Sequence, residues 1–260
     1  MMSIQRQRGF TLIEILVALF VGLFLLGGLF TILQTTRRTS TNQTGLALLQ
    51  DQQRMAMSIL NDVIQNAGYF DASTYQSAST AWPAAVADGI TGTSLAIGQA
   101  LGGQHTGAAT PDTLVARYAT NGTTDGIINC IGGTAAAPTN YVNTFYILAI
   151  TSAPGIPSSS GLYCSWDGTA AHGSLLVAGV ENLQAWYGVS TQAGLNNVDT
   201  YKTADQMAPA DWLNVTSVRV TLTFINPLYV STLAAQQPQY VYFTRVIALQ
   251  GRTGVVSAGL

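Results

Sequence analysis

The sequence predicts an α+β fold, in which one long N-terminal helix, half membrane-spanning and half amphipathic, packs on an antiparallel β-sheet head. Three observations lead to this prediction. The segment 15–36 is apolar and carries no charged residue. The segment 49–67 repeats apolar residues at helical spacing, and the segment 215–225 alternates apolar and polar residues like a half-buried strand. A helix followed by a run of strands is the order expected of an α+β domain.

The apolar segment is long enough to cross a membrane. Its 22 uncharged positions, Ile15 to Thr36, would span about 33 Å as an α-helix. A secretory signal peptide has a shorter apolar core and a small-residue cleavage site, and neither is found here. The segment is therefore expected to remain in the mature protein. Two arginines lie on each side of it, so positive charge does not fix its orientation.

The helix is expected to continue beyond the membrane segment. A polar patch at 39–45 ends in Gly45, and a bend is expected there. After the patch, apolar residues recur on one face of a helix: Leu49, Ala56, Leu60, Val63 and Ala67. Gly68 is the predicted C-terminal cap, because glycine readily adopts the left-handed conformation in which many helices end. The apolar face is predicted to pack on the sheet of the head.

The rest of the chain is predicted to form loops and then strands. Residues 69–111 are rich in Ser, Thr, Ala and Gly and show turn signals without periodicity, so they are expected to be irregular. Five strands are predicted after them: 113–118, 144–150, 174–189, 215–225 and 240–249. The aromatic residues on these strands are Trp186, Tyr187, Tyr240, Tyr242 and Phe243. We expect them in the core, with a docking surface as the alternative.

Composition and charge exclude several classes of function. Hydrophobic residues make up 48% of the 260 positions, enough for a sizeable core, while charged residues make up only 8%. From Thr39 onward there are six Lys or Arg against eleven Asp or Glu, a net charge of −5. An anionic body repels phosphate backbones, so nucleic acid is not an expected partner.

The two cysteines, Cys130 and Cys164, predict a disulfide. They lie 34 positions apart, a spacing that fits no zinc motif, and the chain has only two histidines to add ligands. A disulfide requires an oxidising compartment, so the body that follows the membrane segment is expected on the outer side of the membrane. Closing this loop would stabilise the fold by about 3–4 kcal/mol on the chain-entropy account.

A search for catalytic chemistry finds no motif, so we expect neither an enzyme nor a cofactor. The chain contains no phosphate-binding glycine loop, no HExxH, no GxSxG and no EF-hand pattern. His105 and His172 lie in glycine- and alanine-rich stretches and are expected to be solvated loop residues. The acidic loop with Asp199, Asp205 and Asp211 is a weak calcium candidate, because its spacing matches no known loop, and no metal site is predicted.

The amino terminus resembles a processing signal. The basic leader "MMSIQRQRG" followed by "FTLIEILVAL" is similar to the type III signal of type IV pilins and type II secretion pseudopilins. The resemblance implies that a prepilin peptidase cuts after Gly9 and methylates the new terminal residue, Phe10. It also implies four parts: a leader (1–9), a membrane and filament-core helix (10–38), an amphipathic helix packed on the head (39–68) and a globular β-rich head (69–260).

Glu14 stands within this apolar helix, where a carboxylate is costly unless it has a partner. Cleavage at Gly9 creates a positive amine four residues before Glu14, and positions i and i+4 share one helix face. The resemblance implies that Glu14 pairs instead with the amine of a neighbouring subunit in the filament. The alternative is a carboxylate solvated near the headgroups. Ala18 and Gly22 form a small-xxx-small pair that lets helices approach closely.

Three further stretches resemble the PilW-type minor pilins: "QRMAMSILNDVIQNAGY", "GVENLQAWYG" and "YFTRVIALQGR". This resemblance implies a pilin-like fold and a structural role in the initiation or tip of a type IV pilus. Implied partners are prepilin peptidase, other minor pilins, the major pilin, inner-membrane lipid and a tip adhesin. The head would lie in the periplasm before assembly and on the filament after it. The alternatives are a J-type pseudopilin of type II secretion and an unprocessed, membrane-anchored periplasmic binding or adhesive module.

Overall fold

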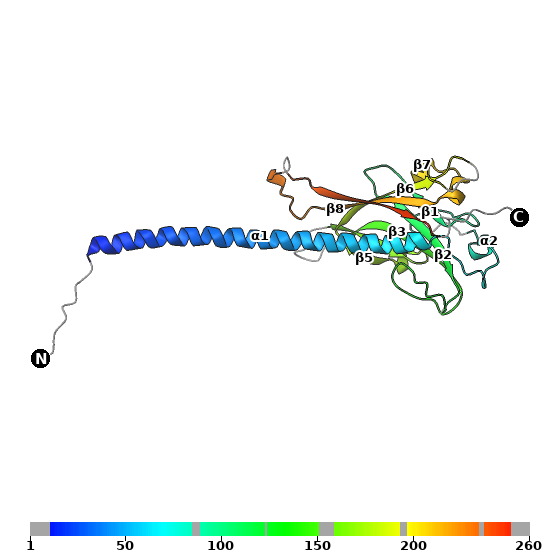
Figure 1. Ribbon diagram of the computed structural model, residues 1–260, viewed down its shortest axis with the longest axis horizontal. Coiled ribbons are helices and arrows are strands. Elements are labelled where there is room, and N and C mark those ends of the chain that lie inside the picture. The colour runs from blue at the N-terminus through cyan, green and yellow to red at the C-terminus, as the bar shows by residue number, and fades with distance from the viewer. Residues whose placement is uncertain are drawn as a thin grey trace. The chain divides into compact units, whose positions relative to one another are not determined.

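A computed structural model of the chain describes residues 11–84, 89–122, 124–150, 159–192, 197–233 and 237–250. The chain divides into two compact units, residues 1–48 and 49–260. The predicted processing site, Gly9 and Phe10, lies outside the described residues. The second unit, called the head below, contains all the described strands, and Figure 1 labels most of them by number.

Helix α1 runs from Leu12 to Asn66 and belongs in part to each unit. The bend expected at 39–45 does not interrupt it. Within this patch the hydroxyls of Thr41 and Thr44 donate to the carbonyls of Arg37 and Ser40, one turn earlier in the same helix, both at 3.0 Å. Hydroxyls that bond to the carbonyl four residues earlier leave the backbone hydrogen bonds of the helix in place, so the Thr-rich patch is compatible with a continuous helix.

The part of α1 in the head is amphipathic, as predicted. Its buried residues are Leu49, Ala56, Met57, Leu60, Val63 and Ile64. Gly68 follows the helix with φ of +87°, the left-handed region, and donates its N–H to the carbonyl of Arg117 at 2.9 Å. The glycine cap is therefore confirmed, and it joins the end of α1 to strand β2, Thr113–Thr120.

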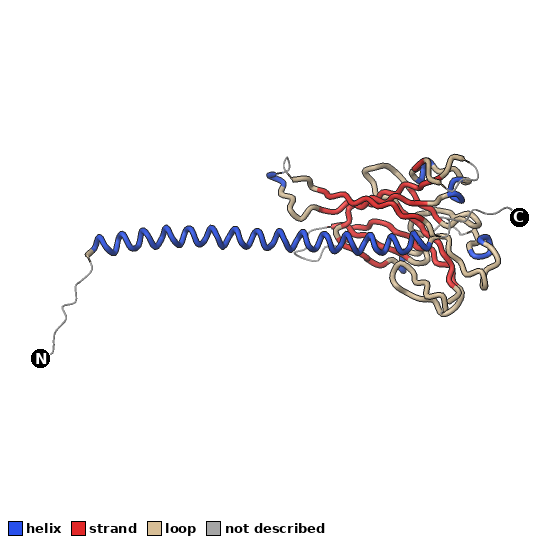
Figure 2. Tube along the Cα trace, in the orientation of Figure 1, coloured by secondary structure: helices blue, strands red, loops and turns tan. Residues whose placement is uncertain are grey.

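The head contains two antiparallel sheets, not one. The first has the order β1-β2-β3-β4-β5 and the second the order β7-β6-β8-β9. The bounds in the first sheet are Leu101–Gln104, Thr113–Thr120, Thr139–Ile150, Ser159–Ser165 and Ser174–Ala178. In the second sheet β6 is Val180–Val189, β7 Thr200–Lys202, β8 Ser217–Ile225 and β9 Tyr240–Ala248. The α+β class is confirmed, and Figure 2 shows the end of α1 among the strands.

The single strand predicted at 174–189 is wrong, and Gly179 is the reason. It has φ of +79°, which no strand residue adopts, and it separates β5 from β6. Its N–H donates to the carbonyl of Ser160 in β4 at 2.8 Å, while the N–H of Ile225, at the end of β8, donates to its carbonyl at 3.3 Å. Gly179 is thus the residue at which the chain leaves the first sheet and enters the second.

The loop region predicted at 69–111 contains more structure than expected. It holds the short helix α2, Ala78–Ala81, and strand β1, while the later strands β4 and β7 were also not predicted. In β1 the carbonyl of Gly102 accepts a hydrogen bond from the hydroxyl of Tyr187 in β6 at 3.0 Å. Short connecting 3₁₀ turns occupy Ala170–His172, Ala204–Gln206, Asp211–Asn214 and Ser231–Leu233.

The core of the head lies where α1 and the two sheets meet. Residues from all three are completely buried and belong to one apolar cluster: Leu60, Ile64, Leu114, Phe145, Leu162, Leu183 and Phe224. Burying each Leu or Phe side chain stabilises the fold by about 1.5–3 kcal/mol relative to leaving it exposed to water. The helix end is thus an integral part of the head, which it joins to the N-terminal segment.

Candidate assembly site

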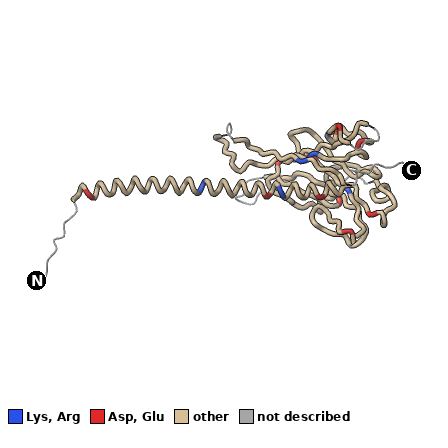
Figure 3. The backbone as a smooth tube through the Cα atoms, in the orientation of Figure 1, with Lys and Arg blue, Asp and Glu red and all other residues tan. Residues whose placement is uncertain are grey.

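The first turns of α1 present an apolar surface that no described residue covers. Among the described residues, α1 is the helix that is long and apolar enough to cross a membrane by length and composition. All its large apolar side chains from Leu12 to Leu33 are at least half exposed. Figure 3 shows one acidic position near the start of the helix and then no charge until the arginines at 37 and 38. Such a surface requires lipid or other apolar helices around it.

Glu14 has a partner that the sequence analysis did not name. Its carboxylate accepts hydrogen bonds from the backbone N–H of Thr11 at 3.0 Å and from the Thr11 hydroxyl at 2.9 Å. In return the N–H of Glu14 donates to the Thr11 hydroxyl at 3.4 Å. This is a reciprocal capping box, and the T-x-x-E spelling of residues 11–14 was the signal for it. In the uncut chain Glu14 is thus satisfied by the helix start itself.

Ala18 and Gly22 lie on the exposed part of α1, as the small-xxx-small prediction requires. Ala18 is exposed and Gly22 is half-buried. A Cβ placed on Gly22 would have no atom within 4 Å among the described residues. Packing within the single chain therefore does not require glycine at this position.

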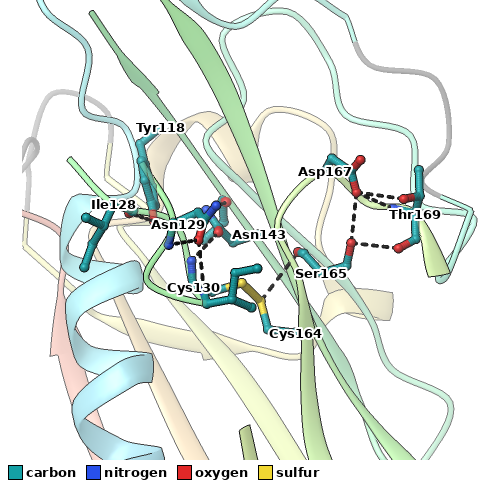
Figure 4. The surroundings of a disulfide bond; sticks show 12 residues. Tyr118, Ile128, Asn129, Cys130, Asn143, Cys164, Ser165, Asp167 and Thr169 are labelled. Carbon is teal, nitrogen blue, oxygen red and sulfur yellow. Dashed lines mark hydrogen bonds between the residues drawn. A yellow bond between two sulfur atoms is a disulfide. The ribbon is translucent and has the colours of Figure 1, made fainter. Parts of the chain in front are cut away.

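The cysteines form the predicted disulfide (Figure 4). Cys130 and Cys164 are bonded, both are buried, and their Cα atoms lie 6.4 Å apart. The bond ties the loop after β2 to strand β4. The N–H of Cys130 also donates to the side-chain oxygen of Asn143 in β3 at 2.8 Å, and the hydroxyl of Tyr118 donates to the carbonyl of Ile128 at 2.7 Å. The loop 128–133 is therefore fixed by one covalent bond and several hydrogen bonds.

This loop and the end of α1 enclose a pocket of about 300 Å³. Asp62 and Asn66 supply the polar side chains from the helix, whereas three apolar side chains remain substantially exposed: Met55 at 51%, Ile128 at 50% and Ile131 at 41%. The remaining wall comes from Ile59, Val63, Tyr118, Asn129, Cys130, Gly132 and Leu176. The sequence analysis did not predict this pocket, because its walls are far apart in the chain.

Each histidine pairs with an aspartate through Nδ1. His172 is half-exposed and lies 2.6 Å from Asp167, in keeping with a solvated loop residue. The same prediction for His105 is wrong: its side chain is 16% exposed and its Nδ1 lies 2.7 Å from Asp112, which is buried. Asp112 also accepts from the N–H of Ala185 in β6 at 2.8 Å, and burial raises the pKa of its carboxyl.

The three carboxylates of the weak calcium candidate do not converge. Asp199 accepts hydrogen bonds from Thr191, Asp205 accepts one from the hydroxyl of Thr203, and Asp211 forms an ion pair with Lys202 at 2.7 Å. Among the described residues there is no group of three His, Cys, Asp or Glu that could hold a metal ion.

Arg117 is a buried cation that the sequence analysis missed. It is completely buried on β2, and its guanidinium donates to the carbonyls of Gln99 at 2.6 Å, Pro83 at 2.7 Å and Ala96 at 2.8 Å. Burial lowers the pKa of Arg117 to about 10. Three carbonyls aimed at one guanidinium indicate a structural clamp on Pro83, Ala96 and Gln99, since Arg supplies five donors in a fixed fork.

The geometry defines a class of protein: an exposed apolar helix that starts at a T-x-x-E capping box and ends inside an α+β head is type IV pilin-like. Two comparisons agree with this class. Residues 4–30 match the family model of the prokaryotic N-terminal methylation motif. Residues 144–250, from β3 to the end of β9, match that of the type IV pilus-assembly protein W, PilW.

Together the two matches support a PilW-type type IV minor pilin, as the resemblance of the sequence implied. They indicate a structural, non-enzymatic protein, and the methylation motif implies processing by prepilin peptidase and assembly with other pilins. No curated protein and no solved structure matches the chain significantly.

Proposed function

We propose that the chain is a minor pilin that helps to initiate a type IV pilus or to form its tip after prepilin peptidase cleaves it between Gly9 and Phe10. The observation that carries this proposal is the joint occurrence of the methylation motif at 4–30 and the PilW match at 144–250 in one chain. The proposal divides the chain into a leader (1–9), a membrane and filament-core helix (10–38), an amphipathic helix (39–68) and a head (69–260).

Cleavage changes the partner of Glu14. In the uncut chain the carboxylate accepts from Thr11, and cutting after Gly9 places a positive amine on Phe10, four residues before Glu14. An amine of the neighbouring subunit can take the same position relative to the carboxylate when the helix leaves lipid for the filament. Because an unpaired charge in an apolar bundle is strongly unfavourable, this pairing would set the axial register between subunits.

Ala18 and Gly22 would serve close approach between helices. Among the described residues, no neighbour lies within 4 Å of a Cβ placed on Gly22, so a neighbouring helix could pack its backbone against this position. The exposed apolar side chains from Leu12 to Leu33 would then be buried first by lipid and later by other pilin helices. The proposed partners are accordingly prepilin peptidase, inner-membrane lipid, other minor pilins, the major pilin and a tip adhesin.

The disulfide supports a place for the head in the periplasm. The Cys130–Cys164 bond forms and persists in an oxidising compartment, which for a chain with one N-terminal membrane helix lies beyond the inner membrane. We therefore place the chain in the inner membrane as a single-pass protein with its head outside, and on the filament after assembly.

The direct test is mass spectrometry of the N-terminal peptide from membranes of cells with and without an active prepilin peptidase. A terminal methyl-Phe10 that depends on the peptidase is expected. An intact Met1 in cells with active peptidase would overturn the proposal and would favour an unprocessed, membrane-anchored periplasmic binding or adhesive module.

Deletion of the gene distinguishes a subunit of a type IV pilus from a subunit of a type II secretion system, since both carry this signal. A minor pilin is required for surface pili, so the deletion should reduce piliation and twitching and leave protein secretion unchanged. Loss of secretion with normal pili would instead assign the chain as a J-type pseudopilin. The match to PilW rather than to a secretion protein favours the first outcome.

A further inference from the structure

Among the described residues, no strand pairs with the outer edge of β9, the last strand of the second sheet. The sheet order β7-β6-β8-β9 pairs β9 with β8 alone. The other described edges are shorter: β1 has 4 residues, β5 has 5 and β7 has 3, against 9 for β9. An unpaired strand presents a row of N–H and C=O groups that another strand can bind.

The register shows which backbone groups face outward. The N–H of Asn226 donates to the carbonyl of Gln239, and the N–H of Leu249 donates to the carbonyl of Thr216, both at 2.9 Å. Hydrogen-bonded positions alternate along an antiparallel pair, so the odd-numbered residues between 239 and 249 bond to β8. The N–H and C=O of Tyr242, Thr244 and Val246 therefore point away from the sheet.

The side chains at these outward positions are also exposed. Tyr242 is 66% exposed and Val246 is 53% exposed, and Thr244 between them is exposed too. The expectation that Tyr242 packs in the core is therefore wrong, whereas Tyr187 is completely buried. Phe243 lies on the opposite face of β9 and packs against the core. Successive side chains of a strand point to opposite faces, and this explains why Tyr242 is exposed and Phe243 is not.

Two of the common protections of a sheet edge, proline and a bulge, are missing from β9. It contains no proline, its pairing with β8 has no bulge, and its one charged residue, Arg245, lies between two outward-facing positions. By contrast the pairing of the edge strand β5 shifts register at Leu162/Tyr163. Arg245 is exposed and forms no ion pair with any described residue.

We propose that β9 is a docking edge onto which an extended segment of another protein adds as a fifth strand of this sheet. The segment carries apolar side chains at alternate positions, next to Tyr242 and Val246, and a carboxylate opposite Arg245. A second copy of β9 does not supply this charge, because the sequence YVYFTRVIA contains no acidic residue. The inference rests on the proposed function in one respect: it assigns the head a partner within the assembly.

The test is photo-crosslinking of the full chain in cells that produce it, with p-benzoylphenylalanine placed in turn at positions 242, 244 and 246. Side chains of adjacent strands lie opposite each other on one face. The three positions should therefore crosslink to one segment of one protein, at sites two residues apart and in consistent order. This order is the signature of strand pairing, and all three positions are exposed.

Matched variants test the backbone and the charge. Thr244→Pro removes an outward N–H without touching the β8 ladder, whereas Thr244→Val keeps that N–H and removes the same hydroxyl contact with Thr221. Thr244→Pro should lower the crosslinking yield at positions 242 and 246 at least fivefold, and Thr244→Val should leave it unchanged. Arg245→Glu should lower the yield as well, and Arg245→Lys should retain it.

Several outcomes would overturn the proposal: crosslinks without consistent order, crosslinks to residues 251–260 of the same chain or to β9 of a second copy, or equal yields for Thr244→Pro and Thr244→Val. The N-terminal peptide measured in the same cells keeps this result separate from the proposed function. If methyl-Phe10 is found but the crosslinks show no consistent order, the proposed docking edge is rejected and the proposed minor pilin function still stands.

Discussion

The carboxylate of Asp112 accepts a hydrogen bond from the backbone N–H of Ala185 at 2.8 Å. Asp112 immediately precedes β2, and Ala185 lies in the middle of β6, so this bond connects the two sheets of the head. The N–H of Asp112 donates in turn to the carbonyl of Leu183 at 2.7 Å. The pair is buried, which makes it a specific constraint on how the sheets are placed.

Asp112→Ala should therefore destabilise the head. It leaves the N–H of Ala185 and the Nδ1 of His105 without their acceptor in a buried position, at a cost of about 1–3 kcal/mol. Urea unfolding of the detergent-solubilised chain, followed by tryptophan fluorescence, measures the change. Asp51→Ala, at an exposed position on α1, is the control and should have little effect. Equal stability of the two variants would contradict a structural role for Asp112.

Loss of the disulfide should have a larger effect. It closes a loop of 34 positions and should contribute about 3–4 kcal/mol on the chain-entropy account. The free energy of unfolding should fall by about this amount in the double variant Cys130→Ser/Cys164→Ser, and by a similar amount in the reduced wild type. Hydrogen exchange should increase first in residues 128–133, which form a wall of the pocket beside α1. Unchanged exchange in this loop would show that its hydrogen bonds hold it without the disulfide.

The ion pair between Lys202 and Asp211 should make stability depend on pH in the acidic range. The hydrogen bond from Lys202, followed by that from the N–H of Ala208, lowers the pKa of Asp211. The pair's stabilisation is therefore complete above the pKa of an unfolded aspartate, about 3.9, and is lost as the pH falls through the lower folded pKa.

Asp211→Asn should consequently unfold more easily than wild type at neutral pH, by less than about 1 kcal/mol because the pair is partly exposed. The difference should shrink as the pH falls from about 4, where the unfolded chain begins to protonate this carboxyl, through the lower folded pKa of Asp211. Urea unfolding at a series of pH values measures it. A difference that stays constant down to pH values well below that point would contradict the assigned role of the charge.

The parts of the fold that could be predicted from the sequence are those with a regular period. The 3.6-residue repeat in α1 and the alternation in β8 each report one buried face, and Gly68 marks the end of the helix because few other residues adopt its φ. The division into two sheets was not predictable in this way. Gly179 lies in a continuous β-like stretch, and only its partners, Ser160 and Ile225, reveal the change of sheet.

The candidate site was predictable where the residues are adjacent in sequence and not where they are distant. Glu14, Ala18 and Gly22 follow from local spacing, and the T-x-x-E box at Thr11 could have been found in the same way. Arg117 depends on carbonyls 18 to 34 residues earlier in the chain, for which no local signal exists. Likewise, the exposed edge at β9 follows from which strand is last in the sheet, and strand order is a property of the tertiary fold.

Gly22 offers a test of helix packing that does not involve the head. Gly22→Leu should leave the fold and processing unchanged, since a Cβ at this position meets no atom within 4 Å among the described residues. It should reduce incorporation into filaments several-fold if another helix packs closely there. Gly22→Ala, which keeps a small residue, is the matched control. Quantitative immunoblots of sheared filaments and of membranes measure both, and equal incorporation of both variants would contradict close packing at Gly22.

Glu14→Gln tests the proposed charge pairing most directly, because glutamine keeps the length of the side chain and can still accept from Thr11. The capping box should persist, and the peptidase should still produce methyl-Phe10, since the cut site itself is unchanged. Incorporation into filaments should fall at least fivefold, because the neighbouring amine loses its anionic partner in an apolar bundle. Normal processing with reduced incorporation would separate assembly from maturation, and the membrane pool should rise accordingly. Normal incorporation would show that Glu14 serves only to cap the start of α1, through its hydrogen bonds with Thr11.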